Sequence, residues 1–93
     1  MFTGIIEEVG QVLAIEHDAG NIHFTIGSAL SSGFKIDQSV AHNGCCLTVV
    51  AQQPQQHTVT AIQETLNKTN LGTWVVGTKV NLERCMQLGG RLD

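Results

Sequence analysis

Short runs in which apolar and polar residues alternate recur along the chain and constrain its fold more than any other feature. In NIHFTIG, the apolar residues Ile22, Phe24 and Ile26 share one face, while the polar residues share the other. Alternation with a period of two is typical of a β-strand that is buried on one side only. We therefore expect a protein built largely from half-buried strands.

Other segments of strand character lie on both sides of this run, and turn residues separate them. They are residues 4–17, 38–41, 45–52, 57–63 and 79–83. Gly10 interrupts the first of these segments, which predicts a bend or bulge at the glycine. The dipeptide Asn43-Gly44 predicts a tight hairpin, because Asn-Gly is the strongest short hairpin signal. Residues 18–21 and 53–56 supply two further turns.

The remaining segments read as connections. Residues 28–37 show little alternation and predict a connection with one short helical turn, and ETLNKTNLG, residues 64–72, predicts a short helix closed by a glycine. About six strands with short connections in a chain of 93 residues favour one domain, either a closed barrel or a compact sandwich. Closure removes the unpaired strand edges that invite aggregation. In the last strand we expect Val80 and Leu82 to point inward.

The composition argues against several classes of protein. A formal net charge of −3 with five basic residues leaves no patch for phosphates, so we expect no nucleic acid partner. No apolar run approaches the ~18 residues of a membrane helix, and no export signal opens the chain, so we expect a cytoplasmic protein without a membrane partner. Cys45 and Cys46 are adjacent and should face opposite sides of a strand, which favours reduced thiols. No cysteine or histidine spacing predicts a metal site.

Four motifs together are specific for a known family. They occur in the order MFTGIIE at the start, SVAHNGCCLTV at residues 39–49, ETLNKTNLG at residues 64–72 and VNLER at residues 80–84. With these motifs the sequence resembles the amino-terminal half of riboflavin synthase. The resemblance implies an all-β fold, a closed six-stranded antiparallel Greek-key barrel with one short helix. Residues 1–87 are then a barrel that binds lumazine or flavin, and residues 88–93 are a truncated linker toward a missing second barrel.

The resemblance also implies an enzyme, a transferase of riboflavin biosynthesis. In this family two molecules of 6,7-dimethyl-8-ribityllumazine exchange a four-carbon unit and yield riboflavin and a diaminopyrimidine, with no cofactor required. Each site of the family forms between a first barrel and a second barrel of another subunit in a homotrimer. The chain alone would therefore provide ligand binding and half of an active site, with little activity of its own. We expect the isolated domain to form a homodimer through an apolar face left bare.

The resemblance places Cys46 and Ser39 in the catalytic region. Thr48 lies two residues beyond Cys46 and should share its face of the strand. The thiol of Cys46 is either a nucleophile or a polarisable contact, and we favour the contact, because no neighbouring base or cation in the sequence would lower its pKa. A cysteine in a β-run is most often a small buried hydrophobe, and Cys45 keeps that interpretation.

The expected ligand contacts come from several parts of the chain. We predict substrate binding by Phe2, Thr3, Gly4, Leu47, Thr48, Thr60, Ile62 and Thr65. The MFTG segment covers the ligand or orders the barrel mouth, although Phe2 alone could also plug the barrel. The backbone of Ile62 is our candidate for pairing with the ring edge, and Thr65 is the candidate for the ribityl hydroxyls.

The other polar residues have less specific interpretations. We expect His42 to serve the geometry of the turn, with a smaller chance of a role as general base. We expect His17, His23 and His57 to lie on the surface, and Glu7, Glu8 and Glu64 to mark solvated edges. Two further functions stay open beside the enzyme domain: a binding-only carrier of lumazine or flavin, and a truncated domain that only associates with itself.

Overall fold

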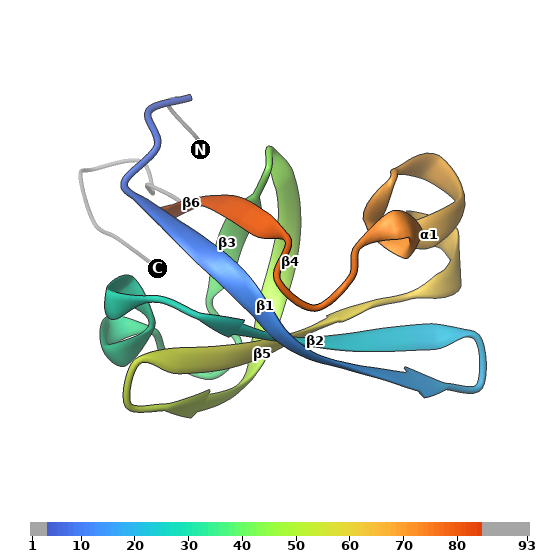
Figure 1. The fold of residues 1–93 in the computed structure, drawn as a ribbon, viewed down its shortest axis with the longest axis horizontal. Helices are drawn as coiled ribbons and strands as arrows, with labels where there is room; N and C mark the ends of the chain where they lie inside the picture. Colours follow the sequence, from blue (N-terminus) through green and yellow to red (C-terminus); the bar gives the residue numbers. More distant parts are fainter. Residues whose placement is uncertain (1–3, 85–93) are drawn as a thin grey trace.

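Within residues 4–84, which the computed structural model describes, six antiparallel strands close into one barrel (Figure 1). The strand order around the barrel is β1-β2-β5-β4-β3-β6. The strands are β1 (Glu8–Asp18), β2 (Asn21–Gly27), β3 (Ser39–His42), β4 (Cys45–Gln53), β5 (Gln56–Ala61) and β6 (Lys79–Arg84). The predicted closed six-stranded antiparallel barrel is confirmed, and this order is compatible with the predicted Greek-key connection. The predicted linker at residues 88–93 lies outside the described residues.

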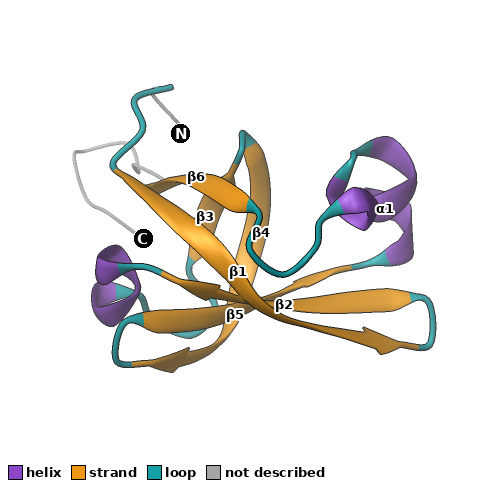
Figure 2. Cartoon of the chain, viewed as in Figure 1, coloured by secondary structure: helices purple, strands orange, loops and turns teal. Residues whose placement is uncertain are grey.

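Short helical segments lie at opposite ends of the barrel (Figure 2). They are the 3-10 helix η1 (Ala29–Gly33), the helix α1 (Gln63–Lys68) and the 3-10 helix η2 (Leu71–Thr73). The helical turns predicted within residues 28–37 and 64–72 are therefore confirmed. The predicted glycine stop is wrong, because α1 is capped by Thr69, whose hydroxyl donates to the Thr65 carbonyl at 2.8 Å. No helix within residues 4–84 is long and apolar enough to span a bilayer.

The core fills the barrel with side chains from alternate positions of every strand. Ile22, Phe24 and Ile26 point inward as predicted, and so do Val80 and Leu82. Trp74, which precedes β6, closes over this core with its ring edge-on to that of Phe24, the centroids 5.0 Å apart. Burial of such side chains contributes about 1.5–3 kcal/mol each, so the alternation is what stabilises the barrel.

Two hairpins use the tight turns that the sequence predicts. Asn43 and Gly44 both have positive φ, 53° and 83°, and they join β3 to β4. Ala19 and Gly20 have φ of 51° and 92° and join β1 to β2. Positive φ at both central residues is the mark of a type I′ turn, whose twist matches that of the flanking strands. The predicted Asn-Gly hairpin is confirmed.

The irregularity in β1 does not lie at Gly10, where the sequence predicts it. The register against β2 shifts between Val12 and Ala14 instead. Gly10 stays in regular pairing, because β1 and β2 approach closely there: a Cβ at this position would lie 2.9 Å from Ile26 Cγ2 and 3.0 Å from the carbonyl oxygen of Gly27. This glycine therefore allows close packing and does not bend the strand.

Candidate functional site

The outer face of β4 carries the side chains that the sequence selects for ligand contact. Cys46, Thr48 and Val50 are exposed, whereas Leu47 and Val49 between them are buried in the core. This alternation follows from the strand pleat, which sends successive side chains to opposite faces. The prediction that Cys46 and Thr48 share one face of the strand is confirmed, and the structure shows that this face points away from the core.

A cavity of about 330 Å³ opens over this face, between β4, the end of β5 and the start of α1. It is lined by Cys46, Leu47, Thr48, Val50, Thr60, Ile62 and Thr65. The paired register of β4 and β5 ends at Val49 and Val59, so Thr48 and Thr60 lie directly beyond the last pair. Backbone groups at the end of a ladder can pair with a flat ligand edge, and the volume falls in the usual range for small-molecule sites.

Most of the residues predicted for binding meet at this cavity, which we call the β4–β5 cavity. The side chain of Leu47 belongs to the core, so this residue can offer the cavity its backbone. Ile62 follows β5 as the N-cap of α1, and its carbonyl accepts a hydrogen bond from the Leu66 N–H at 3.0 Å. Val50 was missed, although continuing the alternation from Cys46 through Thr48 would have found it.

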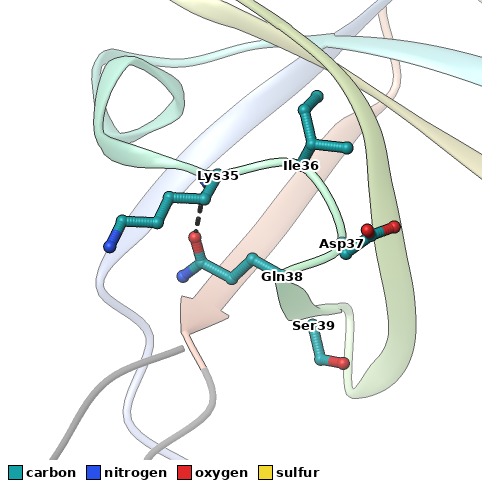
Figure 3. A pocket seen from close by; sticks show the side chains of 5 residues that line it. All are labelled: Lys35, Ile36, Asp37, Gln38 and Ser39. Atoms are coloured by element: carbon teal, nitrogen blue, oxygen red, sulfur yellow. Dashed lines mark hydrogen bonds between the residues drawn. The ribbon is translucent and has the colours of Figure 1, made fainter.

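Ser39 lies beside the β4–β5 cavity and does not line it. Its Cα pairs with that of Thr48 across β3 and β4, but Ser39 lines a separate cavity of about 340 Å³ with residues 35–38 (Figure 3). In that loop the Gln38 side chain accepts a hydrogen bond from the Lys35 N–H at 2.8 Å, and the Ser39 side chain points away from both. The structure therefore brings Ser39 next to Thr48 and leaves it one strand away from the cavity lining.

Gly4, which precedes β1, is attached to β6. The Gly4 N–H donates to Glu83 Oε1 at 3.0 Å, and Glu83 is buried. Glu83 pairs with Ala41 of β3, which pairs in turn with Cys46 of β4. Gly4 is therefore held two strands away from Cys46, outside the cavity lining. Phe2 and Thr3 lie outside the described residues.

Comparison with known proteins decides the family. A sequence model of the lumazine binding domain matches residues 3–85. The chain belongs to the lumazine-binding domain family. The barrel is also similar to that in the crystal structure of LumP complexed with riboflavin, with a TM-score of 0.83 and 27% identity over 89% of this chain and 46% of that one.

Several riboflavin synthases are similar to this lumazine-binding domain. The protein of Bacillus amyloliquefaciens is 42% identical over 92 residues, which cover 98% of this chain and 43% of that protein. The protein of Mycobacterium tuberculosis (strain ATCC 25618 / H37Rv) is 45% identical over 94 residues, which cover 99% of this chain and 47% of that protein. The predicted resemblance is confirmed, and the chain spans about half the length of these relatives.

The side chains of the two adjacent cysteines of this lumazine-binding domain point to opposite faces of β4. Cys45 lines another cavity, of about 400 Å³, between the β3–β4 turn and residues 69–71, and it packs against the core. Burial raises the pKa of the Cys45 thiol, and the neighbouring Cys46 raises it further. Cys45 is half-buried and packs against the core, in keeping with its interpretation as a small hydrophobe.

The lining of the β4–β5 cavity carries hydroxyls and one thiol. No histidine, lysine, arginine or carboxylate is among the described residues that line it. A thiol becomes a strong nucleophile when a base or cation stabilises its thiolate, and this lining offers neither. Among residues 4–84 no three histidine, cysteine or acidic side chains form a metal-binding group. On its own the cavity is equipped to bind and orient a polar ring.

Two of the histidine predictions are wrong. His42 ends β3 before the turn and is fully buried, and His57 is 1% exposed. Their Nε2 atoms lie 2.9 Å apart, and His57 Nδ1 lies 2.6 Å from the hydroxyl of Ser31. A signal for this burial was present, because His57 alternates in step with Val59 and Ala61 on the inward face. His17 is exposed, as predicted.

Two of the three predicted edge carboxylates form ion pairs in the fold. Glu7 forms an ion pair with Arg84 at 2.8 Å, with each side chain 30% exposed. The hydrogen bond from the Arg84 side chain holds the pKa of Glu7 below its ordinary value. This pair ties the start of β1 to β6. Glu64 lies on the surface of α1, where it pairs with Lys68 at 3.0 Å.

Proposed function

We propose that this chain is the first barrel of a riboflavin synthase and that it binds 6,7-dimethyl-8-ribityllumazine or riboflavin in the β4–β5 cavity. The observation that carries the proposal is the cavity itself. Residues from three separate elements, which sequence reasoning selected for ligand contact, surround one space of suitable size. The similarity to riboflavin synthases over nearly the whole chain supports the same ligand class.

The cavity matches the chemistry of a fused heterocycle that carries a polyhydroxylated chain. In our proposal the ring lies over Cys46 and Thr48, whose thiol and hydroxyl face the cavity. The backbone at Ile62 pairs with the alternating donors and acceptors of the ring edge. The hydroxyl of Thr65, in the first turn of α1, forms hydrogen bonds with the ribityl hydroxyls. The side chain of Leu47 packs in the core beneath the cavity.

Turnover requires more than this barrel offers. In the proposed reaction a four-carbon unit passes between two molecules of the same substrate, so no external oxidant or reductant is needed. Proton transfers at the two rings still need acid and base groups, and the described lining of this cavity has none. We propose that a second barrel from another subunit completes the site. In this proposal Cys46 contacts the ring of the ligand. Ser39 belongs to the same catalytic region and contributes from the neighbouring strand β3.

The assembly follows from the same proposal. In the full-length protein the site forms in a homotrimer, and the isolated domain pairs with a second copy of itself. Exposed apolar side chains that such pairing could cover include Ile5, Val75 and Val76, which are 70%, 63% and 64% exposed. We also propose a cytoplasmic location, in keeping with the reduced thiols expected of Cys45 and Cys46.

A binding-only carrier of lumazine or flavin is the second candidate. The observation that favours it is the similarity to LumP, whose structure was determined with riboflavin bound. The presence of both Ser39 and Cys46 favours the synthase. The carrier and the synthase make the same prediction for binding and opposite predictions for turnover by the full-length protein.

The proposal is tested by titrating riboflavin with the isolated domain and following flavin fluorescence. We expect saturable quenching, and an unchanged fluorescence at high protein concentration would contradict the binding site. Turnover of 6,7-dimethyl-8-ribityllumazine should be very low for the domain alone and substantial for the full-length protein. Full activity of the isolated domain would contradict the half-site, and a full-length protein that binds without turnover would establish the carrier.

A further inference from the structure

Thr60, one of the hydroxyls of the β4–β5 cavity, is backed by a histidine that does not line the cavity. His23 of β2 pairs with Thr60 of β5, and His23 Nδ1 lies 2.7 Å from Thr60 Oγ1. On the other side of the ring, His23 Nε2 lies 3.2 Å from Oδ2 of Asp18, the last residue of β1. Asp18, His23 and Thr60 thus form a row across three strands that ends in the cavity.

The partners in this row determine where the protons lie. A carboxylate only accepts hydrogen bonds, so His23 Nε2 must carry the proton that it shares with Asp18. The neutral ring has one N–H, which leaves His23 Nδ1 as an acceptor. The Thr60 hydroxyl therefore donates its proton to His23. The hydroxyl oxygen keeps both of its lone pairs, so Thr60 is an acceptor toward the cavity.

We propose that His23, assisted by Asp18, is a positioning residue that holds Thr60 Oγ1 as a hydrogen-bond acceptor for the bound ligand. The inference rests on the proposed function, because it assumes a lumazine or flavin ligand. Such ligands carry two kinds of donor, the imide N–H of the ring and the O–H groups of the ribityl chain. Thr60 thereby favours a ligand that presents a donor at this point of the cavity and disfavours one that presents an acceptor there.

The same two strands contain a matched control. Thr25 and Thr58 pair two residues further along β2 and β5, and their hydroxyls lie 3.2 Å apart. Both are half-buried, as His23 and Thr60 are, and neither lines the β4–β5 cavity. Loss of this pair removes a similar cross-strand contact from the same face of the barrel without touching the cavity.

The test begins with riboflavin affinity. Thr60→Val and His23→Phe should each weaken riboflavin binding about 3- to 10-fold, the effect of one lost hydrogen bond. Thr25→Val should change it less than about 2-fold. His23→Asn should restore affinity relative to His23→Phe, because its side-chain oxygen can occupy the position of Nδ1. Asp18→Ala should have the smallest effect in the row, since the Asp18 side chain is 65% exposed.

Ligand analogues identify the donor. Lumiflavin keeps the imide N–H and lacks the ribityl chain, whereas 3-methylriboflavin keeps the chain and lacks the imide proton. A loss for Thr60→Val confined to riboflavin and one of these two analogues supports the inference and names the partner group. Equal losses for all three ligands, or no loss for any, would overturn it. Absence of riboflavin binding by the unaltered chain would instead overturn the proposed function.

A measurement without ligand tests the proton positions directly. Nitrogen NMR of the imidazole should show His23 protonated at Nε2 and unprotonated at Nδ1 in the folded domain. The opposite tautomer would overturn the inference even if variants at this position fail to fold. Circular dichroism of each variant separates a loss of fold from a loss of affinity.

Discussion

The imidazole rings of His42 and His57 meet inside the barrel, with 2.9 Å between their Nε2 atoms. The Val40 carbonyl, 2.9 Å from His42 Nδ1, accepts the proton on that nitrogen, so His42 Nε2 is unprotonated and accepts from His57. His57 Nδ1 is then free to accept from the Ser31 hydroxyl at 2.6 Å. Each ring nitrogen of His42 and His57 has a hydrogen-bond partner when both rings are neutral, and one more proton on either ring would break one of these hydrogen bonds.

We predict that the domain loses stability as the pH falls below about 6.5. Burial lowers the pKa of His42 to about 4, and burial together with the nearby His42 lowers that of His57 to about 3, both from an ordinary 6.5. As the pH falls below about 6.5, these histidines bind protons in the unfolded chain before they do so in the folded domain. Proton binding therefore stabilises the unfolded state, and the free energy of unfolding decreases as the pH falls. The loss is at most about 1.4 kcal/mol per histidine and pH unit. Urea unfolding at pH 7.5, 6.0 and 5.0 measures it.

Substitution of His57 tests whether the buried histidine pair causes this pH dependence. A glutamine at position 57 offers one donor and one acceptor, so His57→Gln should fold with reduced stability and show a shallower loss between pH 6.5 and 5. His17→Gln is the control, because His17 is exposed and lies outside the buried pair. A slope for His57→Gln equal to that of the unaltered domain would show that the buried pair does not cause the acid sensitivity.

We predict that Ser31→Ala destabilises the domain by about 1–3 kcal/mol, because it leaves His57 Nδ1 buried without its donor. Ser32→Ala is a neighbouring control. Its hydroxyl accepts an exposed hydrogen bond from the Gln55 N–H at 2.9 Å, so its loss should cost less than about 1 kcal/mol. Thermal and urea unfolding at neutral pH compare the two. Equal losses would argue that the Ser31 hydroxyl contributes little.

Gly10→Ala should destabilise the barrel by about 1–3 kcal/mol, the usual cost of overpacking. The added Cβ would lie 2.9 Å from Ile26 Cγ2 and 3.0 Å from the Gly27 oxygen, and this backbone oxygen cannot move without disturbing the β1–β2 pairing. Gly33→Ala is the matched control, because a Cβ there meets nothing within 4 Å. Urea unfolding should leave Gly33→Ala within about 0.5 kcal/mol of the unaltered domain. Similar results for both variants would refute the close approach.

The two cysteines should differ in what their loss affects. Cys46→Ser should weaken ligand binding by the domain and activity of the full-length protein, by about 5-fold, since Cys46 lines the β4–β5 cavity. Cys45→Ser should lower stability by about 1 kcal/mol and leave ligand affinity nearly unchanged, since Cys45 packs against the core. Riboflavin titration and urea unfolding of both variants separate these effects. The reverse order would show that the wrong cysteine was assigned to the ligand.

Local patterns predicted the strands and the inward face of their alternating apolar residues. The pleat alternates side chains along a single strand, so the position of Cys46 and Thr48 on one face follows from their spacing alone. The Asn43-Gly44 turn is likewise local, because its two residues tolerate the positive φ that a tight hairpin needs. Each of these features depends on neighbouring residues, which is why a sequence without coordinates suffices for them.

Contacts across strands could not be predicted in this way. Ser31 meets His57 over 26 positions and His23 meets Thr60 over 37, and both contacts depend on which strands are neighbours in the closed barrel and on their register. Ser39 reaches a separate cavity although its strand was placed correctly, because the loop before β3 shapes its surroundings. Periodicity along the chain encodes inside and outside, whereas the partner of each side chain is set by closure of the barrel.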